Sequence, residues 1–332
     1  MSEIDVDFNF VFVPSHFDWT ANANTTFLWE CLFALACLRS NANNNGGQGI
    51  IVWGENVEVS VDISNSQISG NGYGQTSPKI PNADFYTVPK VGIAVESVGC
   101  DVMINGVTSK DNEGNGIAMK CVEKAVVVMK DTVASNNRGD VGIGTLTAQE
   151  CNVNFDGVTS NANEGRGIAI GCRKDAYIKM KDIEASNNQG DVGIGLGFVQ
   201  AVAIVDLEGT ITSSENEQVG MAVTTIVDSN VVLNVKGNVN LAKNGGEPAP
   251  DSFSSGSGFG DFISGALDIV VEEGGSFQSC GNEDNAFDIE GYVSNLSGTL
   301  TWTGDFTCDP DKVQLKGGSQ PNCLPCPGAV VN

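Results

Sequence analysis

Three aspartates stand at the same distance before a serine in successive stretches of the chain. Asp131, Asp156 and Asp182 each precede a serine by four residues, and Asn65 and Asn105 hold the matching place in earlier stretches. If these stretches stack as neighbouring strands, equivalent side chains lie about 4.8 Å apart. Carboxylates at that distance repel one another unless a cation or a base intervenes, and Ca²⁺ prefers carboxylate oxygens. The spacing predicts a site for Ca²⁺ or for a basic ligand at these aspartates; the alternative is a solvated turn with splayed side chains.

A second set of acidic residues lies in the polar segments between those stretches. Glu113 recurs as Glu164 at an offset of 51 residues, and Asp140 recurs as Asp191 at the same offset. An aspartate beside a glycine can accept hydrogen bonds from backbone N–H groups in a tight turn. We therefore expect these acids to shape corners of the fold, with cation binding as the alternative.

Two cysteine pairs repeat with the same spacing. Cys100 and Cys121 are 21 residues apart, and so are Cys151 and Cys172. We predict a disulfide within each pair that joins neighbouring turns of a repeat. A chain of 332 residues with 10 cysteines suits an oxidising compartment. The alternative at each position is a buried free thiol.

The remaining cysteines lie near the two ends of the chain. We predict three bridges among them: Cys280–Cys308, Cys31–Cys37 and Cys323–Cys326. The Cys323–Cys326 pair also forms a CxxC motif, but it has no second CxxC or histidine pair to complete a zinc site.

Short strands of a repeat must position all these residues. A serine followed seven residues later by a glycine recurs five times, and these glycines stand 25 to 27 residues apart: Gly116, Gly142, Gly167, Gly193 and Gly220. A short apolar run follows each glycine, then a turn, a β-branched run and a polar corner. Such a period predicts a single-stranded parallel β-helix of about nine turns. Residues 107–157 also match residues 158–208, so the repeating unit is two turns.

Less regular segments bound the repeat. Thr25–Leu38 is rich in Leu, Phe and Ala, which predicts a helix within an N-terminal cap over residues 1–40; a helix lying on a membrane is the alternative. Residues 41–310 form the β-helix, and Cys, Pro and Gly in residues 311–332 indicate a C-terminal cap. Residues 70–91 and 243–261 are rich in Gly, Pro and Ser, and we interpret them as corner insertions.

The charge of the chain restricts its partners. The chain has 41 acidic and 17 basic residues and a formal net charge of -24. It offers no basic surface to displace counterions from nucleic acid, so nucleic acid is excluded as a partner. The apolar run of residues 27–38 is too short to span a bilayer. Sequons at Asn24 and Asn295 predict glycosylation and fit an extracellular or cell-surface location.

The corner sequence resembles that of a known fold. The N-E-G-x-G-I pattern at Asn112–Ile117 and Asn163–Ile168 resembles the right-handed parallel β-helix repeat of the pectin-lyase-like superfamily. The resemblance covers about residues 40–310 and implies a right-handed coil. It implies little about activity, because the motif is structural.

The resemblance suggests one enzymatic alternative. A lyase of this kind would need Ca²⁺ at an acidic cluster and a basic residue near it, and Arg138 and Arg166 are the candidates for that base. Paired aspartates with a Gly-His-Gly element, as in polygalacturonases, are missing, because the single histidine is His16. If the chain is an enzyme, we expect a Ca²⁺-dependent lyase for acidic polysaccharide, or a glycoside hydrolase.

The sequence favours a module without a catalytic site over an enzyme. We expect a structural, adhesive or glycan-contacting protein whose partners are polysaccharides or cell-surface and matrix components. Tyr73, Phe85 and Tyr86 of the first insertion are the predicted ligand-binding aromatics. The open ends and long sides of a solenoid permit oligomers.

Overall fold

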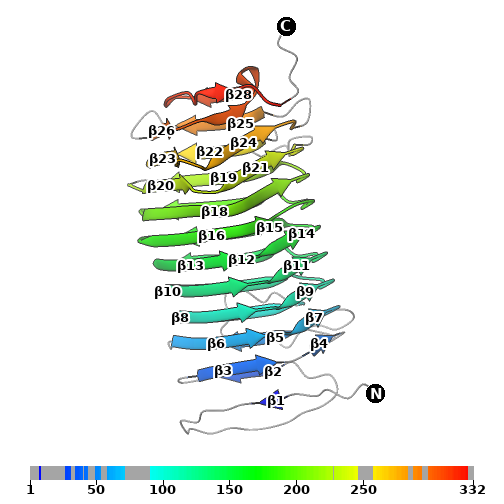
Figure 1. Ribbon diagram of the computed structural model, residues 1–332. Helices are drawn as coiled ribbons and strands as arrows, with labels where there is room; N and C mark the ends of the chain where they lie inside the picture. The colour runs from blue at the N-terminus through cyan, green and yellow to red at the C-terminus, as the bar shows by residue number, and fades with distance from the viewer. Residues whose placement is uncertain are drawn as a thin grey trace.

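The structure, a computed structural model, consists in its described part of stacked strands that almost all pair in parallel, with essentially no helix. It describes residues 49–53, 58–71, 90–226, 228–245, 257–282, 287–293 and 298–327, together with the strands β1 (Asp7–Phe8), β2 (Phe27–Glu30), β3 (Ala34–Arg39) and β4 (Asn41–Asn43). The side chains of these four strands and of residues 51, 53 and 146–148 are not described. Figure 1 shows the strands lying one above another from β1 to β28 (Val313–Lys316).

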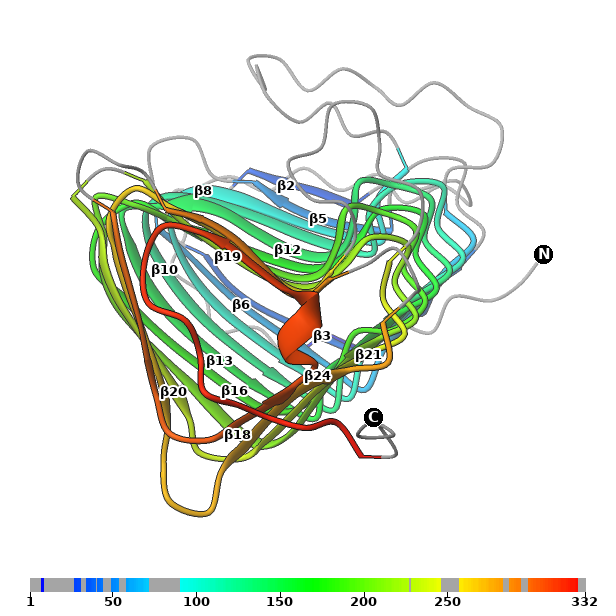
Figure 2. The same cartoon turned by 90° about the horizontal axis from the view of Figure 1, so that it is seen from above.

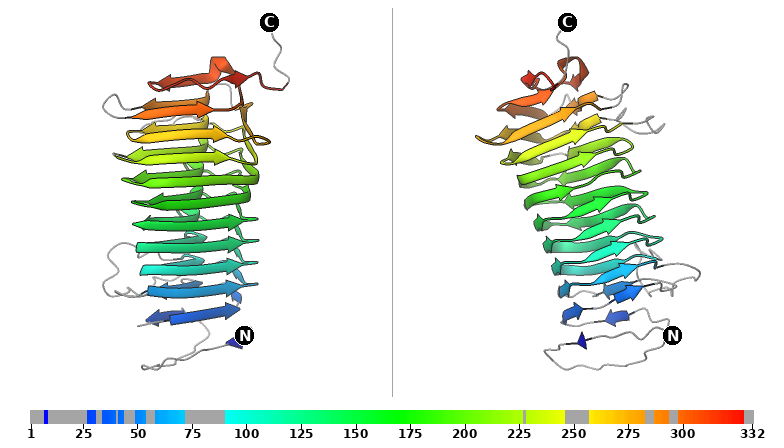
Figure 3. Two further views of the ribbon diagram at one scale, coloured as in Figure 1. Left: turned by 60° about the vertical axis from the view of Figure 1, so that its left-hand side comes forward. Right: turned by 45° about the vertical axis from the view of Figure 1, so that its right-hand side comes forward.

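Each turn of the coil has three sides, and each side is a parallel sheet. The first side contains β5 (Ile50–Trp53), the first part of β8 (Ile93–Asn105) and of β10 (Ile117–Lys130), β12 (Val141–Ala148), β15 (Arg166–Cys172), β17 (Val192–Val199), β19 (Val219–Ile226), β22 (Ser257–Ile263) and β25 (Phe287–Val293). Parallel hydrogen bonding joins each of these strands to the next turn, and the side views in Figure 3 show the resulting stack.

The second side continues each turn after a bend. It contains β6 (Glu58–Ser64), the later parts of β8 and β10, β13 (Glu150–Asp156), β16 (Ala176–Glu184), the first part of β18 (Val202–Ser214), β20 (Asn230–Val235), β23 (Ala266–Val271) and β26 (Thr299–Thr303). The third side is short: β7 (Gln67–Ser69), β9 (Thr108–Lys110), β11 (Val133–Ser135), β14 (Thr159–Asn161), the end of β18, β21 (Asn238–Ala242), β24 (Ser276–Cys280) and β27 (Phe306–Cys308).

The coil has a triangular cross-section and a right-handed sense. Figure 2 looks down the axis from the C-terminal end, and β19, β20 and β21 follow one another counter-clockwise there. The chain advances toward the viewer, so this order is that of a right-handed coil. About seven turns succeed one another, from β8 to β24. The expected number of about nine was too high; the strands β5, β6 and β7 before β8, and β25, β26 and β27 after β24, belong to outer turns whose connecting residues lie partly outside the described part of the chain.

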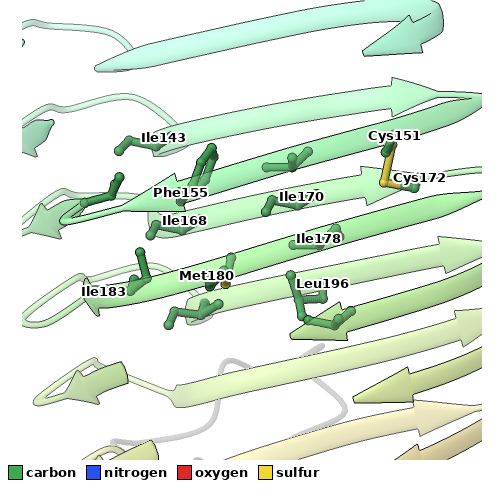
Figure 4. Packing of buried hydrophobic residues seen from close by; sticks show 14 of the residues in the cluster. Ile143, Cys151, Phe155, Ile168, Ile170, Cys172, Ile178, Met180, Ile183 and Leu196 are labelled. Carbon is green, nitrogen blue, oxygen red and sulfur yellow. A yellow bond between two sulfur atoms is a disulfide. The ribbon is translucent and has the colours of Figure 1, made fainter. Parts of the chain in front are cut away.

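Alternation of side chains explains why these residues form strands. In β10 the inward residues Ile117, Met119 and Val127 are buried and their neighbours face outward, as the period of a strand requires. Inward residues also stack between turns. Ile117, Ile143 and Ile168 pair in register and are 0% exposed. Figure 4 shows such side chains filling the interior, where β-branched residues fit the narrow space.

The predicted helix at Thr25–Leu38 is wrong for the residues described there. β2 pairs in parallel with β5, and β3 pairs in parallel with β6, so this segment adds to the first and second sides. Its run of Leu, Phe and Ala could not by itself distinguish a helix from a buried strand. The hydrogen bonds offered by the next turn decide for the strand.

Buried asparagines connect the turns at the corner between the third and first sides. At each step the backbone N–H and the side-chain amide of one asparagine donate to the carboxamide oxygen of the next. Amide-to-oxygen distances are 2.8 Å from Asn112 to Asn137 and 3.0 Å from Asn137 to Asn163. We call this series the asparagine ladder: Asn71, Asn112, Asn137, Asn163, Asn188, Asn216, Asn244 and Asn282.

The corner serines follow the predicted register only in alternate turns. Ser109, Ser160 and Ser213 donate to the carbonyl oxygens of Gly116, Gly167 and Gly220 at 2.8, 2.7 and 2.6 Å. In the turns between them an alanine holds the inward position, because Ala134 pairs with both Ser109 and Ser160. The corner from Asn137 to Gly142 is one residue longer than that from Asn112 to Gly116, which moves Ser135 outward.

Both central disulfides occur as predicted. Cys100 is bonded to Cys121 and Cys151 to Cys172, with Cα atoms 5.6 and 6.0 Å apart. Each bond joins the start of one second side to the end of the next turn's first side. Figure 4 shows the Cys151–Cys172 bond at that bend. Since the two bonds lie 51 residues apart in the sequence, each two-turn unit contains one.

Two predicted terminal bridges are wrong. Cys280 is bonded to Cys326, and Cys308 to Cys323. The tail folds back as β29 (Cys323–Leu324), which pairs with β27 and brings Cys323 and Cys326 beside the last turns. The predicted Cys31–Cys37 bridge lies outside the described residues, because Cys31 and the side chain of Cys37 are not described. A three-residue 3₁₀ helix, Pro310–Lys312, interrupts the tail.

Candidate functional site

The structure separates the three aspartates predicted to form one column. Asp131 and Asp182 are corner residues with left-handed φ of 46° and 53°. Asp156 lies one position earlier, at a strand end, where it pairs with Lys130 and Lys181. The shift arises because Ala134, and not Ser135, is in register with Ser160. The single column is therefore wrong, and Ca²⁺ binding at these residues stays a prediction.

Bases alternate with acids on this edge of the second side. Parallel pairing places Lys130, Asp156, Lys181 and Glu208 in successive turns. The Lys181 Nζ is 3.3 Å from the Asp156 Oδ1 and 3.8 Å from the Asp182 Oδ2. The positive charges of these lysines offset the repulsion between neighbouring carboxylates. A bound cation is therefore not needed for that purpose.

Within the described part of the chain, three potential metal-ligand atoms lie within 4.8 Å of one another only at Cys280, Asp288 and Cys326. Both sulfurs there belong to a disulfide, which leaves a single carboxyl group. The predicted aspartates do not form such a group.

The two candidate arginines are engaged by carboxylates. The Arg138 Nε is 3.5 Å from the Glu164 Oε1, and both side chains are exposed. Arg166 donates from Nε and Nη2 to the two carboxylate oxygens of Asp191, at 2.6 and 2.8 Å. The hydrogen bond to Asp191 raises the pKa of Arg166 further above its ordinary value. Desolvation of the guanidinium opposes this increase, and the negative charges of Asp191 and Asp140 add to it. An arginine serves as a base only after losing its proton, so this geometry weighs against that role.

A shallow groove lies on the outer face of the first side, over β8, β10, β12 and β15. It has a volume of about 230 Å³. Its floor consists of small outward residues in register across four turns: Ala94, Ala118, Gly144 and Ala169. Val91, Asn115 and Val141 form its wall on the side of the asparagine ladder. The backbone comes close to the surface here because no large side chain covers it.

The small residues continue beyond the groove toward the C-terminus. Ala169 pairs with Gly195, Gly195 with Ala222, and Ala222 with Gly260. Two residues further along the last strands, the rings of Phe262 and Tyr292 stack with centroids 5.6 Å apart, and Tyr292 is 44% exposed. The outer face of the first side is thus a smooth strip that ends beside an aromatic pair in which Tyr292 is exposed and Phe262 is half-buried.

Charged residues border the groove in pairs. The Lys120 Nζ is 2.7 Å from the Glu96 Oε1 on one side, and Arg166 is bonded to Asp191 on the other, near Asp140. Lys90, shortly before β8, contacts Glu113. Each of these bases faces a carboxylate, so the groove presents balanced charge. A polyanion would find little net attraction here.

Two further carboxyl groups are buried in the C-terminal turns. Asp261 occupies an inward position, since it pairs with Val223 in the turn before and with Gly291 in the turn after. Burial raises the pKa of Asp261 to about 8. The hydrogen bond from the backbone N–H of Tyr292 opposes this increase, and the negative charge of Glu290 adds to it. Burial also raises the pKa of Asp288, which the Asp309 N–H, the Asn282 amide and Lys312 lower in part.

The asparagine ladder ends on one of these carboxyl groups. The Asn282 amide donates to the Asp288 Oδ1 at 2.9 Å, in the way that each earlier asparagine donates to the next. Asp288 therefore closes the ladder and, at the same time, lies beside the Cys280–Cys326 bond.

Comparison of the chain with protein-family models, with curated proteins and with solved structures returned no match.

Several predicted site residues lie outside the described residues: Tyr73, Phe85, Tyr86, Asn24 and Asn295. The groove floor, by contrast, was missed by the sequence analysis although a signal for it exists. Each corner glycine is followed by an apolar residue and then by Ala or Gly, as in Gly116-Ile117-Ala118 and Gly142-Ile143-Gly144. The alternation of a strand places the apolar residue inward and the small one outward.

Proposed function

We propose that the chain is an extracellular or cell-surface β-solenoid that contacts glycans as a structural or adhesive module, without catalysis. Its contact surface is the strip on the outer face of the first side, from the groove to Phe262 and Tyr292. The observation that carries the proposal is the groove itself, where small residues in four successive turns leave a flat floor between paired charges.

The composition of this strip favours a neutral polysaccharide. An extended polymer can lie along a floor of alanine and glycine, and an exposed aromatic ring offers an apolar face with a wet edge. The net charge of -24 repels polyanions, and the bases that border the groove face acids. This argues against an acidic polysaccharide as the ligand and against the lyase alternative.

An extracellular location and a relationship to the pectin-lyase-like superfamily are parts of the same proposal. Four disulfides support an oxidising compartment. Among the described residues, no helix is long and apolar enough to cross a membrane. The right-handed parallel coil and the N-E-G-x-G-I corners support the relationship.

Affinity electrophoresis through gels containing neutral or acidic polysaccharides tests the proposal. Neutral polymers should retard the protein, and Ala118→Trp, which fills the floor, should abolish the retardation. Val126→Trp is the matched control, because Val126 lies outward on the same strand, β10, on the second side. Retardation that survives Ala118→Trp, or no retardation by any neutral polymer, would reject the proposal.

The lyase alternative has its own assay. Growth of ultraviolet absorbance from an unsaturated product on pectate, alginate or chondroitin with Ca²⁺ would establish it. Loss of that signal in Arg166→Gln would then identify the base. We expect no growth on any of these substrates.

A further inference from the structure

The four described disulfides differ in how open they are to solvent. In the central turns both cysteines of each bond are buried, with Cys100, Cys121, Cys151 and Cys172 all at most 5% exposed. In the C-terminal cap Cys280 is 7% exposed and Cys308 0%, but their partners Cys326 and Cys323 are only half-buried. One cysteine of each terminal bond is therefore more open to a thiol from solution than either cysteine of a central bond.

Only one of these bonds has a carboxyl group beside it. The Cys326 Sγ is 3.7 Å from the Asp288 Oδ2, and the Cys280 Sγ belongs to the same group of atoms within 4.8 Å. Asp288 is 1% exposed. Its carboxyl group is fixed by two donors, the Asn282 amide at 2.9 Å and the Asp309 backbone N–H at 2.7 Å. No other described disulfide shows such a grouping.

We propose that the Cys280–Cys326 bond is a thiol–disulfide exchange site whose substrate is a dithiol, with Asp288 as the proton donor. A thiolate of the dithiol attacks the half-buried Cys326 sulfur and forms a mixed disulfide. The Cys280–Cys326 bond breaks, its electron pair remains on the Cys280 sulfur, and that sulfur takes the proton of the Asp288 carboxyl group.

The second thiol of the dithiol completes the exchange. It attacks the dithiol's first sulfur in the mixed disulfide, gives its proton to the Asp288 carboxylate and releases the Cys326 sulfur as a thiolate. That thiolate takes from solvent the proton that the attacking thiol had lost to solvent. The dithiol is thereby oxidised to a disulfide, and the protein gains two electrons and two protons as two thiols. The reverse sequence closes the bond again, with Asp288 as the proton acceptor.

The surroundings of Asp288 suit this part. Burial keeps its carboxyl group protonated at pH values where an exposed aspartate has lost its proton, and the charge of Asp309 adds to this effect. Lys312, the Asn282 amide and the Asp309 N–H act in the opposite direction. Asn282 follows β24, and Asp309 and Lys312 lie in the segment between β27 and β28. The rate of bond opening per thiolate should therefore fall as pH rises and Asp288 ionises.

Differential alkylation with mass spectrometry on the full chain tests the proposal. The protein is treated with dithiothreitol between pH 5.5 and 8.5, quenched with one alkylating reagent, unfolded, fully reduced and labelled with a second. We expect Cys280–Cys326 to open at least roughly tenfold faster than Cys100–Cys121 and Cys151–Cys172. Cys308–Cys323 should fall between them, because one of its cysteines is also half-buried but it lacks the acid.

Two variants distinguish proton donation by Asp288 from the effect of solvent exposure alone on the rate of bond opening. Asp288→Asn should slow opening of Cys280–Cys326 by about tenfold at acidic pH and flatten its pH profile. Asp311→Asn removes an exposed acid nearby and should change neither. Equal rates for central and terminal bonds, or equal pH profiles for the two variants, would overturn the proposal. If Asp288→Asn fails to fold, a wild-type rate per thiolate that is constant with pH would overturn it equally.

Discussion

The central turns, residues 92–226, and the C-terminal turns, residues 257–327, share one coil but are stabilised differently. The central turns have an interior mainly of aliphatic and sulfur side chains, in which Phe155 and Phe198 are the buried aromatic residues, and two buried disulfides. The C-terminal turns have an aromatic interior, in which Phe259, Phe277, Trp302 and Phe306 meet at centroid distances of 5.0 to 5.8 Å. They also contain two buried carboxyl groups and two half-accessible disulfides.

This difference shows that the end of a repeat is stabilised by other groups than its central turns are. A central turn receives hydrogen bonds and packing from turns on both sides, so small identical side chains suffice. After β25, β26 and β27 the described chain supplies only the short strands β28 and β29, and larger rings and the cross-linked tail fill the place of a full turn. The same replacements introduce groups that respond to pH and to reductant.

The substitution Asp261→Asn should have the largest effect on stability. It removes one of the two buried carboxyl groups of the C-terminal turns. The pKa of Asp261 is about 8 in the folded protein and 3.8 when exposed. The folded state therefore binds this proton more tightly than the unfolded state does. The resulting stabilisation is complete below about pH 4 and is lost as the pH rises to about 8. The loss is on the order of 5 kcal/mol.

Urea denaturation at pH 5 and at pH 8 measures this effect. The wild type should lose stability between the two pH values, and Asp261→Asn should lose much less. Asp268→Asn is the control, because Asp268 is an outward residue on the neighbouring β23. Equal pH dependence in the three proteins would show that surface repulsion, and not Asp261, sets the response.

Asn163→Ala should produce the next largest effect, in the central turns. It removes the acceptor for Asn137 and the donor to Asn188, both in buried positions. A buried polar group left without its partner costs about 1–3 kcal/mol, so we expect a loss of roughly 3 kcal/mol. Thermal unfolding should reveal it as a lowered Tm.

Asn152→Ala is the matched control for the ladder. Asn152 is an exposed residue of β13 in the same turn, and its replacement should change stability by less than about 0.5 kcal/mol. If both variants unfold alike, the ladder does not stabilise the central turns and the comparison loses its basis.

Arg166→Gln should have the smallest effect on stability. Arg166 and Asp191 are about half exposed, and such surface pairs contribute less than about 1 kcal/mol. We expect a Tm within about 2 °C of the wild type, measured alongside Arg138→Gln. A clear loss of stability would mean that the corner ion pairs, and not only the interior, hold the central turns together.

The sequence predicted the coil and both central disulfides because both follow from period alone. It failed where a single residue changes the register. The corner after Asn137 is one residue longer than that after Asn112, so counting from Ser135 misplaced Asp131 relative to Asp156. It failed again at Cys280 and Cys308, because the tail returns to the last turns as a strand, and no spacing within the repeat predicts where a tail returns.

The groove and the buried carboxyl groups required different information. The outward alanines and glycines are visible in the sequence, but their meaning depends on which face they share. Asp261 stands where other turns have Val223 or Ile170, and nothing in its own neighbours marks it as inward. Only the pairing of β22 with β19 and β25 assigns it to the interior.

The two-turn unit has a consequence for the length of the molecule. Each 51-residue unit includes its own disulfide, one serine corner and one alanine corner, and it ends in the register in which it began. Deleting or adding one unit would leave both ends of the protein unchanged and alter its length by two strand spacings, about 9.6 Å. Gene duplication can therefore lengthen the protein in whole steps of one two-turn unit.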